Sequence, residues 1–170
     1  MRIYLIGYMG SGKTSIGKKL SKAFKMNFID LDTYIEEITG KKISMIFELE
    51  GEQYFRKIEQ QQLQIVSQKE DAIIATGGGT ACERINMDLM NTRGLTIYLE
   101  MEAKELYERL VLQKKNRPLI ARLSDKDLMA FIEMSLEMRR KYYTRAKYTI
   151  RSNNITKAVE KCSEFIENTS

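Results

Sequence analysis

The sequence predicts an α/β fold, namely a single three-layer α/β/α domain built on a five-stranded parallel sheet. Short apolar runs alternate with longer segments of helical periodicity along the 170 residues, and such alternation is typical of a parallel sheet covered on both faces. A glycine-rich loop joins the first expected strand to the first expected helix. A chain of this length predicts one domain, over residues 1–170. No apolar run approaches the length of a membrane span, so we expect no membrane partner.

The first strand is expected at Ile3–Ile6, and a helical stripe follows at residues 16–24. Between them lies Gly7-Tyr8-Met9-Gly10-Ser11-Gly12-Lys13-Thr14, which follows the G-x-x-x-x-G-K-[ST] pattern of a P-loop. Glycines let backbone N–H groups turn toward phosphate oxygens, and the helix N-terminus adds partial positive charge. Lys13 reaches the phosphates as a point charge, and the Thr14 hydroxyl suits Mg²⁺. The pattern predicts a protein that binds a nucleoside triphosphate.

The later elements are expected in the following order. A strand at 27–30 ends in Asp30-Leu31-Asp32, and short helices follow at 33–39 and from Ser44, a candidate N-cap. A longer helix after Gly51 is expected to bury one stripe. Its members are Phe55, Ile58, Gln62 and Ile65. Further strands are expected at 72–75, 95–99 and 148–150, and further helices through Leu106 and Leu110, along Leu128–Tyr142, and along Val159, Cys162 and Ile166. The polar and basic segment at about 112–124 holds the only proline and predicts a mobile lid.

Three motifs follow predicted strands, at the edge where parallel sheets bind their ligands. They are the P-loop, the pair Asp30 and Asp32, and the triple glycine Gly77–Gly79. We therefore expect them to meet in one crevice. The third strand ends in Thr76 and glycines, without the aspartate that P-loop proteins often carry there, so Asp30 is the candidate carboxylate for the magnesium shell.

The composition of the chain excludes several classes of function. The net charge is +5, and the densest basic run is Arg139-Arg140-Lys141, which favours anionic small molecules over nucleic acid. The chain has no histidine, which excludes Ser-His-Asp, Cys-His and histidine–metal chemistry. The guanine-reading N-K-x-D pattern is absent, which argues against a GTPase. Two cysteines without a C-x-x-C pair predict reduced thiols and a cytoplasmic location.

Five motifs together resemble those of the shikimate kinase family, in the same order and at similar spacing. They are G-Y-M-G-S-G-K-T, F-I-D-L-D, G-E-x-x-F-R, G-G-G and R-P-L, and the resemblance spans Arg2 to about Arg151. It implies transfer of the γ-phosphoryl group of ATP to the 3-hydroxyl group of shikimate, with ATP and Mg²⁺ as cofactors. It also implies a lid at about 112–124 and shikimate-binding helices at about 33–60.

The resemblance assigns residue roles as well. Lys13, Asp32 and Arg117 would be catalytic, with Asp32 as candidate base and Arg117 closing from the lid. The nucleotide would be held by Gly10, Ser11, Gly12, Lys13, Thr14, Ser15, Arg109, Arg117 and Asn153, and the metal by Thr14 and Asp30. Shikimate would contact Asp32, Phe47, Phe55, Arg56, Gly77, Gly78, Gly79 and Arg139.

Several alternatives remain at this stage. The family usually carries R-x-P-L-Y around its second substrate arginine, whereas this chain has Arg139-Arg140-Lys141-Tyr142-Tyr143, so Arg140 is an alternative to Arg139. Gluconate kinase and nucleoside monophosphate kinase are alternative enzymes, and an ATP-binding regulatory module is the alternative without catalysis. G-E-x-x-F-R with the triple glycine and Arg139 favours shikimate. With no broad exposed apolar stripe in the sequence, we expect a monomer.

Overall fold

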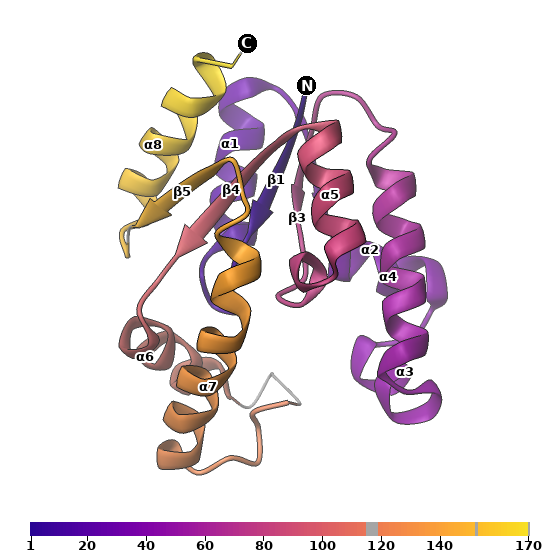
Figure 1. Cartoon of the computed structure of the whole chain (residues 1–170), viewed down its shortest axis with the longest axis vertical. Coiled ribbons are helices and arrows are strands. Elements are labelled where there is room, and N and C mark those ends of the chain that lie inside the picture. The colour runs from indigo at the N-terminus through magenta and orange to yellow at the C-terminus, as the bar shows by residue number, and fades with distance from the viewer. Residues whose placement is uncertain (115–118, 152, 170) are drawn as a thin grey trace.

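The computed structural model describes residues 1–114, 119–151 and 153–169 (Figure 1). Its centre is a five-stranded sheet in the order β2-β3-β1-β4-β5, in which every neighbouring pair is parallel. The strands are β1 (Arg2–Ile6), β2 (Asn27–Asp30), β3 (Ala72–Ala75), β4 (Leu95–Glu100) and β5 (Tyr148–Arg151). The helices are α1 (Lys13–Phe24), α2 (Leu31–Thr39), α3 (Ile43–Glu50), α4 (Glu52–Val66), α5 (Arg84–Arg93), α6 (Ala103–Gln113), α7 (Asp125–Tyr143) and α8 (Ile155–Glu167), with a short 3₁₀ turn at Thr80–Cys82.

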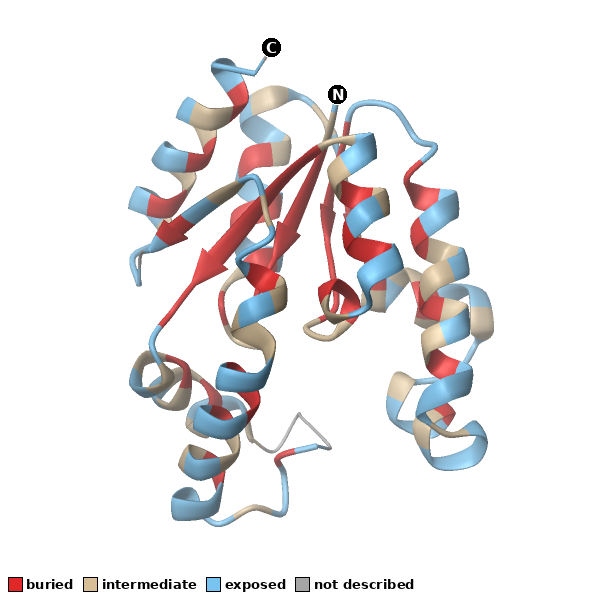
Figure 2. Cartoon of the chain, viewed as in Figure 1, coloured by how far each residue is buried: buried red, intermediate tan, exposed pale blue. Residues whose placement is uncertain are grey.

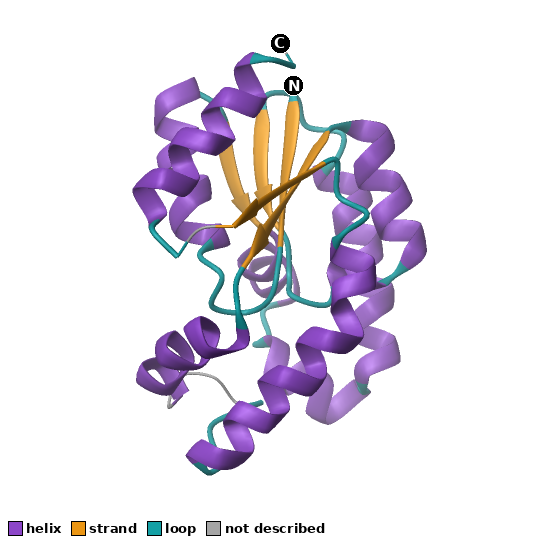
Figure 3. Cartoon of the chain, turned by 60° about the vertical axis from the view of Figure 1, so that its left-hand side comes forward, coloured by secondary structure: helices purple, strands orange, loops and turns teal. Residues whose placement is uncertain are grey.

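Helices cover both faces of the sheet, as Figure 3 shows. The central strand β1 illustrates why, since side chains of a strand alternate between its faces. Ile3 and Leu5 pack with α1 and α8, whereas Tyr4 and Ile6 belong to the core under α4, α5 and α7. All four side chains are fully buried, and Figure 2 shows the buried class along most of the central strands. The predicted five-stranded, three-layer α/β/α architecture is therefore confirmed, and in the described part of the chain no helix is both long and apolar enough to cross a membrane.

Two local predictions about helix starts are wrong. Helix α3 begins at Ile43, so Ser44 lies inside it and is not its cap. The carboxylate of Glu36, on α2, accepts a hydrogen bond from the Ile43 backbone N–H at 3.0 Å and another from Lys42 Nζ at 2.6 Å. A tertiary contact thus satisfies the helix end that a local cap was expected to satisfy. Helix α2 begins at Leu31, two residues earlier than predicted.

The predicted stripe on α4 is also wrong in part. Phe55 is buried as expected, but Ile65 is 45% exposed, and the buried face continues through Glu59, Leu63 and Val66. Helix α5 was not predicted, because its buried face holds only two apolar side chains, Met87 and Met90, beside the polar Asn86. A charged residue, Glu59, therefore occupies a core position of α4, and its partners explain how.

Part of the predicted lid at 112–124 can be described. Arg117 and its neighbours at 115–118 lie outside the described residues. Beyond them, Ile120 is fully buried in the same core as Leu110 and Leu128. The far end of the segment therefore belongs to the same apolar core as the first turn of α7.

Candidate active site

The P-loop wraps the N-terminus of α1. Gly10 and Gly12 have φ angles of 82° and 93°, which favour glycine because a Cβ atom is strained there. Lys13 is buried, and its Nζ donates hydrogen bonds to the carbonyl oxygens of Gly7 at 2.8 Å and Tyr8 at 2.9 Å. The hydroxyl of Ser11 is buried without a hydrogen-bond partner among the described residues. A cationic, donor-rich loop of this kind is suited to phosphate.

A hydroxyl and a carboxylate lie together at the mouth of this loop. Thr14 Oγ1 donates to Asp30 Oδ2 at 2.7 Å, and Asp30 Oδ1 accepts from the backbone N–H of Thr33 at 3.3 Å. Asp30 therefore caps α2 with one oxygen and holds Thr14 with the other. Within the residues that the structure describes, no group of three or more potential metal-binding side chains occurs. Two oxygen ligands fit Mg²⁺, which usually takes the rest of its shell from phosphate and water.

The carboxyl group of Asp32, in the first turn of α2, has a shifted pKa. The pKa of Asp32 is raised to about 6, chiefly by burial and also by the negative charges of Asp30 and Glu59, against the opposing effect of Lys13 and Arg56. Loss of hydration and like charges both disfavour the ionised form. A carboxylate with a pKa near 6 is ionised at neutral pH and is still able to accept a proton.

A cleft of about 690 Å³ opens at the carboxyl ends of the strands. Arg109, on α6, closes one side of it by donating to the carbonyl oxygens of Gly10 at 3.2 Å and Asn153 at 2.6 Å. The cleft brings together most residues predicted for the nucleotide and the metal, namely Gly10, Gly12, Lys13, Thr14, Ser15, Asp30, Arg109 and Asn153. Of the residues predicted for the acceptor, only Asp32 and Gly78 line it. The predicted residues that are described but do not line it are Ser11, Phe47, Phe55, Arg56, Gly77, Gly79 and Arg139. Lining residues that were not predicted are Met9, Thr76, Gln113, Asn154, Ile155 and Thr156.

The triple glycine lies against charged side chains. A methyl group on Gly77 would approach Asp32 Oδ1 to 2.7 Å, and a methyl group on Gly79 would overlap the guanidinium group of Arg56. On Gly78 it would come within 3.4 Å of both Arg139 Nη1 and the Met9 backbone nitrogen. A side chain at Gly77 or Gly79 would therefore require the neighbouring Asp32 or Arg56 side chain to shift.

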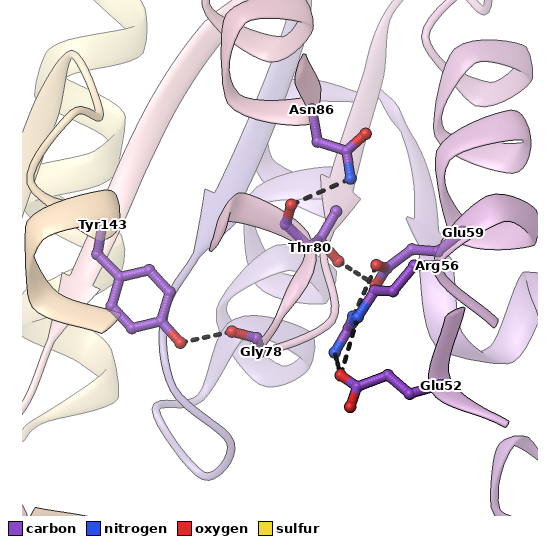
Figure 4. Close-up of polar contacts among 7 residues, drawn as sticks. All are labelled: Glu52, Arg56, Glu59, Gly78, Thr80, Asn86 and Tyr143. Carbon is purple, nitrogen blue, oxygen red and sulfur yellow. Dashed lines mark hydrogen bonds and ion pairs between the residues drawn. The ribbon is translucent and has the colours of Figure 1, made fainter. Parts of the chain in front are cut away.

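Arg56 is held by a carboxylate pair on its own helix (Figure 4). Its Nη1 lies 2.7 Å from Glu59 Oε2, and its Nη2 lies 3.1 Å from Glu52 Oε1. Glu59 is only 1% exposed, and its second oxygen accepts a hydrogen bond from Thr80 Oγ1 at 2.6 Å. This full pairing explains how a carboxylate remains in the core of α4. Sequence reasoning missed Glu59, although its position three residues after Arg56 places both on one helix face.

The two candidate substrate arginines point to different places. The Arg139 guanidinium lies 5.3 Å from the ring centroid of Tyr8, and its Nη1 is next to Gly78. Arg140 is instead among the charges that act on Tyr98, whose pKa burial raises to about 12. The structure therefore brings Arg139, and not Arg140, to the glycine loop.

The two aromatic residues that were predicted to contact the substrate lie next to each other. The rings of Phe47, on α3, and Phe55, on α4, have centroids 4.7 Å apart. Phe55 is buried, and the guanidinium of Arg56 lies 5.3 Å from the centroid of its ring. An apolar surface and a cation thus adjoin each other beside the glycine loop.

Known proteins resemble this chain along nearly its whole length. Residues 9–170 match the family model of shikimate kinase. A shikimate kinase of Parabacteroides distasonis is 47% identical over 148 residues, which are 87% of this chain and 86% of that protein. The crystal structure of shikimate kinase from Bacteroides thetaiotaomicron is 38% identical with a TM-score of 0.94, covering 98% of both chains. Shikimate kinase from Acinetobacter baumannii in complex with shikimate is 32% identical with a TM-score of 0.88, covering 99% of this chain and 94% of that one.

Proposed function

This chain belongs to the shikimate kinase family and phosphorylates shikimate with ATP, and we propose how its residues divide that reaction. The observation that carries the proposal is that the P-loop, Asp30, Asp32 and Gly78 line one cleft. Phosphate-binding and acceptor-binding groups therefore adjoin, as direct transfer between two bound substrates requires.

The P-loop would bind the phosphates of ATP. Its backbone N–H groups and Lys13 supply the positive charge, and Thr14 with Asp30 would hold Mg²⁺. The hydrogen bond between these two side chains supports this assignment because it already pairs two oxygen ligands. When bound, the metal would neutralise charge on the phosphates. Gly10, Ser11, Gly12 and Ser15, the other residues of this segment, would align the phosphates with the acceptor.

Asp32 would orient the 3-hydroxyl group of shikimate and accept its proton. Phosphoryl transfer depends more on alignment and charge neutralisation than on a strong base. The raised pKa of Asp32, about 6 because of burial, keeps the group ionised at neutral pH while bringing it closer to the pH at which general bases work best.

Arg56 and Arg139 would bind the carboxylate of shikimate from the two sides of the glycine loop. A guanidinium fork matches a carboxylate in geometry and charge, and the contacts of the two arginines with Gly79 and Gly78 support this role. The paired rings of Phe47 and Phe55 would contact the apolar side of the substrate. Gly77, Gly78 and Gly79 would offer backbone groups to its polar side.

The family resemblance supports roles in nucleotide binding for three residues. Arg109 and Asn153, joined by a hydrogen bond, would enclose the adenine. Arg117, in the lid at about 112–124, would close on the transferring phosphate and exclude water. We further propose a monomer in the cytoplasm, where the free thiols of Cys82 and Cys162 would stay reduced.

A coupled assay of ADP release tests the proposal. MgATP is supplied with shikimate, with gluconate, with AMP, and without an acceptor. We expect turnover with shikimate alone. Turnover with gluconate or AMP but not with shikimate would refute the roles of Asp32, Arg56 and Arg139.

A further inference from the structure

The carbonyl oxygens of the glycine loop are satisfied in two different ways. The Gly77 carbonyl accepts a hydrogen bond from the backbone N–H of Thr80 at 3.2 Å, and the Gly79 carbonyl accepts one from the backbone N–H of Cys82 at 3.0 Å. The middle carbonyl, of Gly78, accepts instead from the side-chain hydroxyl of Tyr143 at 2.5 Å, from α7 (Figure 4). The first and last peptide groups are thus fixed locally, whereas the middle one depends on a distant helix.

The orientation of this middle peptide group has a consequence for binding. In a trans peptide the C=O and N–H groups point in opposite directions, and the chain has no cis peptide among its described residues. A bond that fixes the Gly78 carbonyl therefore also fixes the direction of the Gly79 N–H, away from Tyr143. Glycine has more backbone freedom than any other residue, so without this bond the peptide group would have to be ordered by the substrate itself.

Tyr143 is well placed to impose this order. Its side chain is fully buried, and its ring lies 5.1 Å from that of Tyr98. Burial raises the pKa of Tyr143 well above its ordinary value, so the hydroxyl stays a donor throughout the neutral range. Arg139 lies four residues earlier on the same helix face, with its Nη1 beside Gly78. One helix thus brings both a cation and a hydrogen-bond donor to the same residue.

We propose that Tyr143 is a positioning residue for the acceptor substrate, because its hydroxyl fixes the Gly78–Gly79 peptide group on which the acid binds. This inference rests on the proposed function, in which the glycine loop and Arg139 contact shikimate. Tyr143 acts through the loop and through its neighbour on α7, and not by touching the substrate.

The test compares Tyr143→Phe with Tyr98→Phe. Both substitutions remove one hydroxyl from the same pair of neighbouring rings, but the Tyr98 hydroxyl is buried with no hydrogen-bond partner in the described structure, so Tyr98→Phe is the matched control. For each variant KM and kcat are measured for shikimate and for ATP. The assay temperature is kept well below the thermal unfolding midpoint of the least stable variant. Loss of one neutral hydrogen bond predicts a rise of about threefold to tenfold in KM for shikimate in Tyr143→Phe, with KM for ATP unchanged.

Two outcomes would overturn the inference. One is a KM for shikimate that is the same in Tyr143→Phe and Tyr98→Phe. The other is an equal rise in KM for both substrates, which is the mark of a merely structural role. The variant Arg139→Lys distinguishes failure of this inference from failure of the proposed function. If Arg139→Lys raises KM for shikimate and Tyr143→Phe does not, only the inference about Tyr143 fails. If Arg139→Lys has no effect, the proposed carboxylate site itself is wrong.

Discussion

Glu59 offers a sharp test of how the substrate arginine is held. We predict that Glu59→Gln weakens shikimate binding because Arg56 loses its buried anionic partner. Glutamine has nearly the same shape, so its amide oxygen is able to accept from Arg56 and its amide nitrogen to donate to the Thr80 hydroxyl. The substitution therefore removes charge while it leaves the packing of α4 intact.

The magnitude follows from the contacts. The bond between Arg56 Nη1 and Glu59 Oε2 is 2.7 Å long, and Glu59 is 1% exposed. A charged hydrogen bond contributes about 1.5–3 kcal/mol and a neutral one about half of that. Because Glu52 still contacts Arg56 at 3.1 Å, we expect a net loss of about 1–2 kcal/mol. That loss corresponds to a rise of roughly fivefold to thirtyfold in KM for shikimate.

The coupled ADP-release assay measures this effect, with Glu52→Gln as the control. Glu52 contacts the same arginine, but its side chain is 65% exposed, so its pair contributes about 0.3–0.5 kcal/mol and its loss about a twofold change. Equal effects of the two substitutions, or a Glu59→Gln enzyme within about twofold of the unmodified one, would refute the reasoning. As a second readout, the pKa of Asp32 should fall in Glu59→Gln, because Glu59 is one of the negative charges that raise it.

Three further predictions concern the same cleft. With a pKa of about 6, Asp32 becomes protonated as the pH falls, so kcat/KM for shikimate should fall about tenfold per pH unit below that value; a profile that stays flat down to pH of about 5 would exclude Asp32 as the base. Asp32→Ala should abolish transfer and leave ATP binding largely intact by calorimetry, and equal loss of both would make Asp32 structural. Gly79→Ala should raise KM for shikimate several-fold by displacing Arg56, with KM for ATP as the internal control.

Local patterns in the sequence were sufficient for part of this description. The P-loop, the strand-end aspartates and the triple glycine are each defined by neighbouring residues, and the rule that parallel strands bind ligands at their carboxyl ends was enough to predict that they meet. The cleft lined by Lys13, Asp30, Asp32 and Gly78 has the expected composition for that reason. The roles of these residues in the reaction stay predictions.

Other features depend on contacts between distant residues, which a local pattern does not contain. Glu59 belongs to the core only because Arg56 and Thr80 pair with it, so a hydrophobic pattern passes over it. Ser44 looks like a helix cap, but Glu36 from the preceding helix takes that role. The choice between Arg139 and Arg140 depends on the rotation of α7 against the sheet.

The geometry of helix α7 also determines where insertions and deletions are compatible with the substrate site. Each residue turns an α-helix by about 100°, so one residue inserted between Arg139 and Tyr143 would point the guanidinium and the hydroxyl in different directions. Deletion of one residue there would do the same. Upstream of Ser124, which caps α7, added or lost residues leave this angular relation untouched. Members of this family should therefore vary in the length of the segment before α7 but keep these two side chains four residues apart.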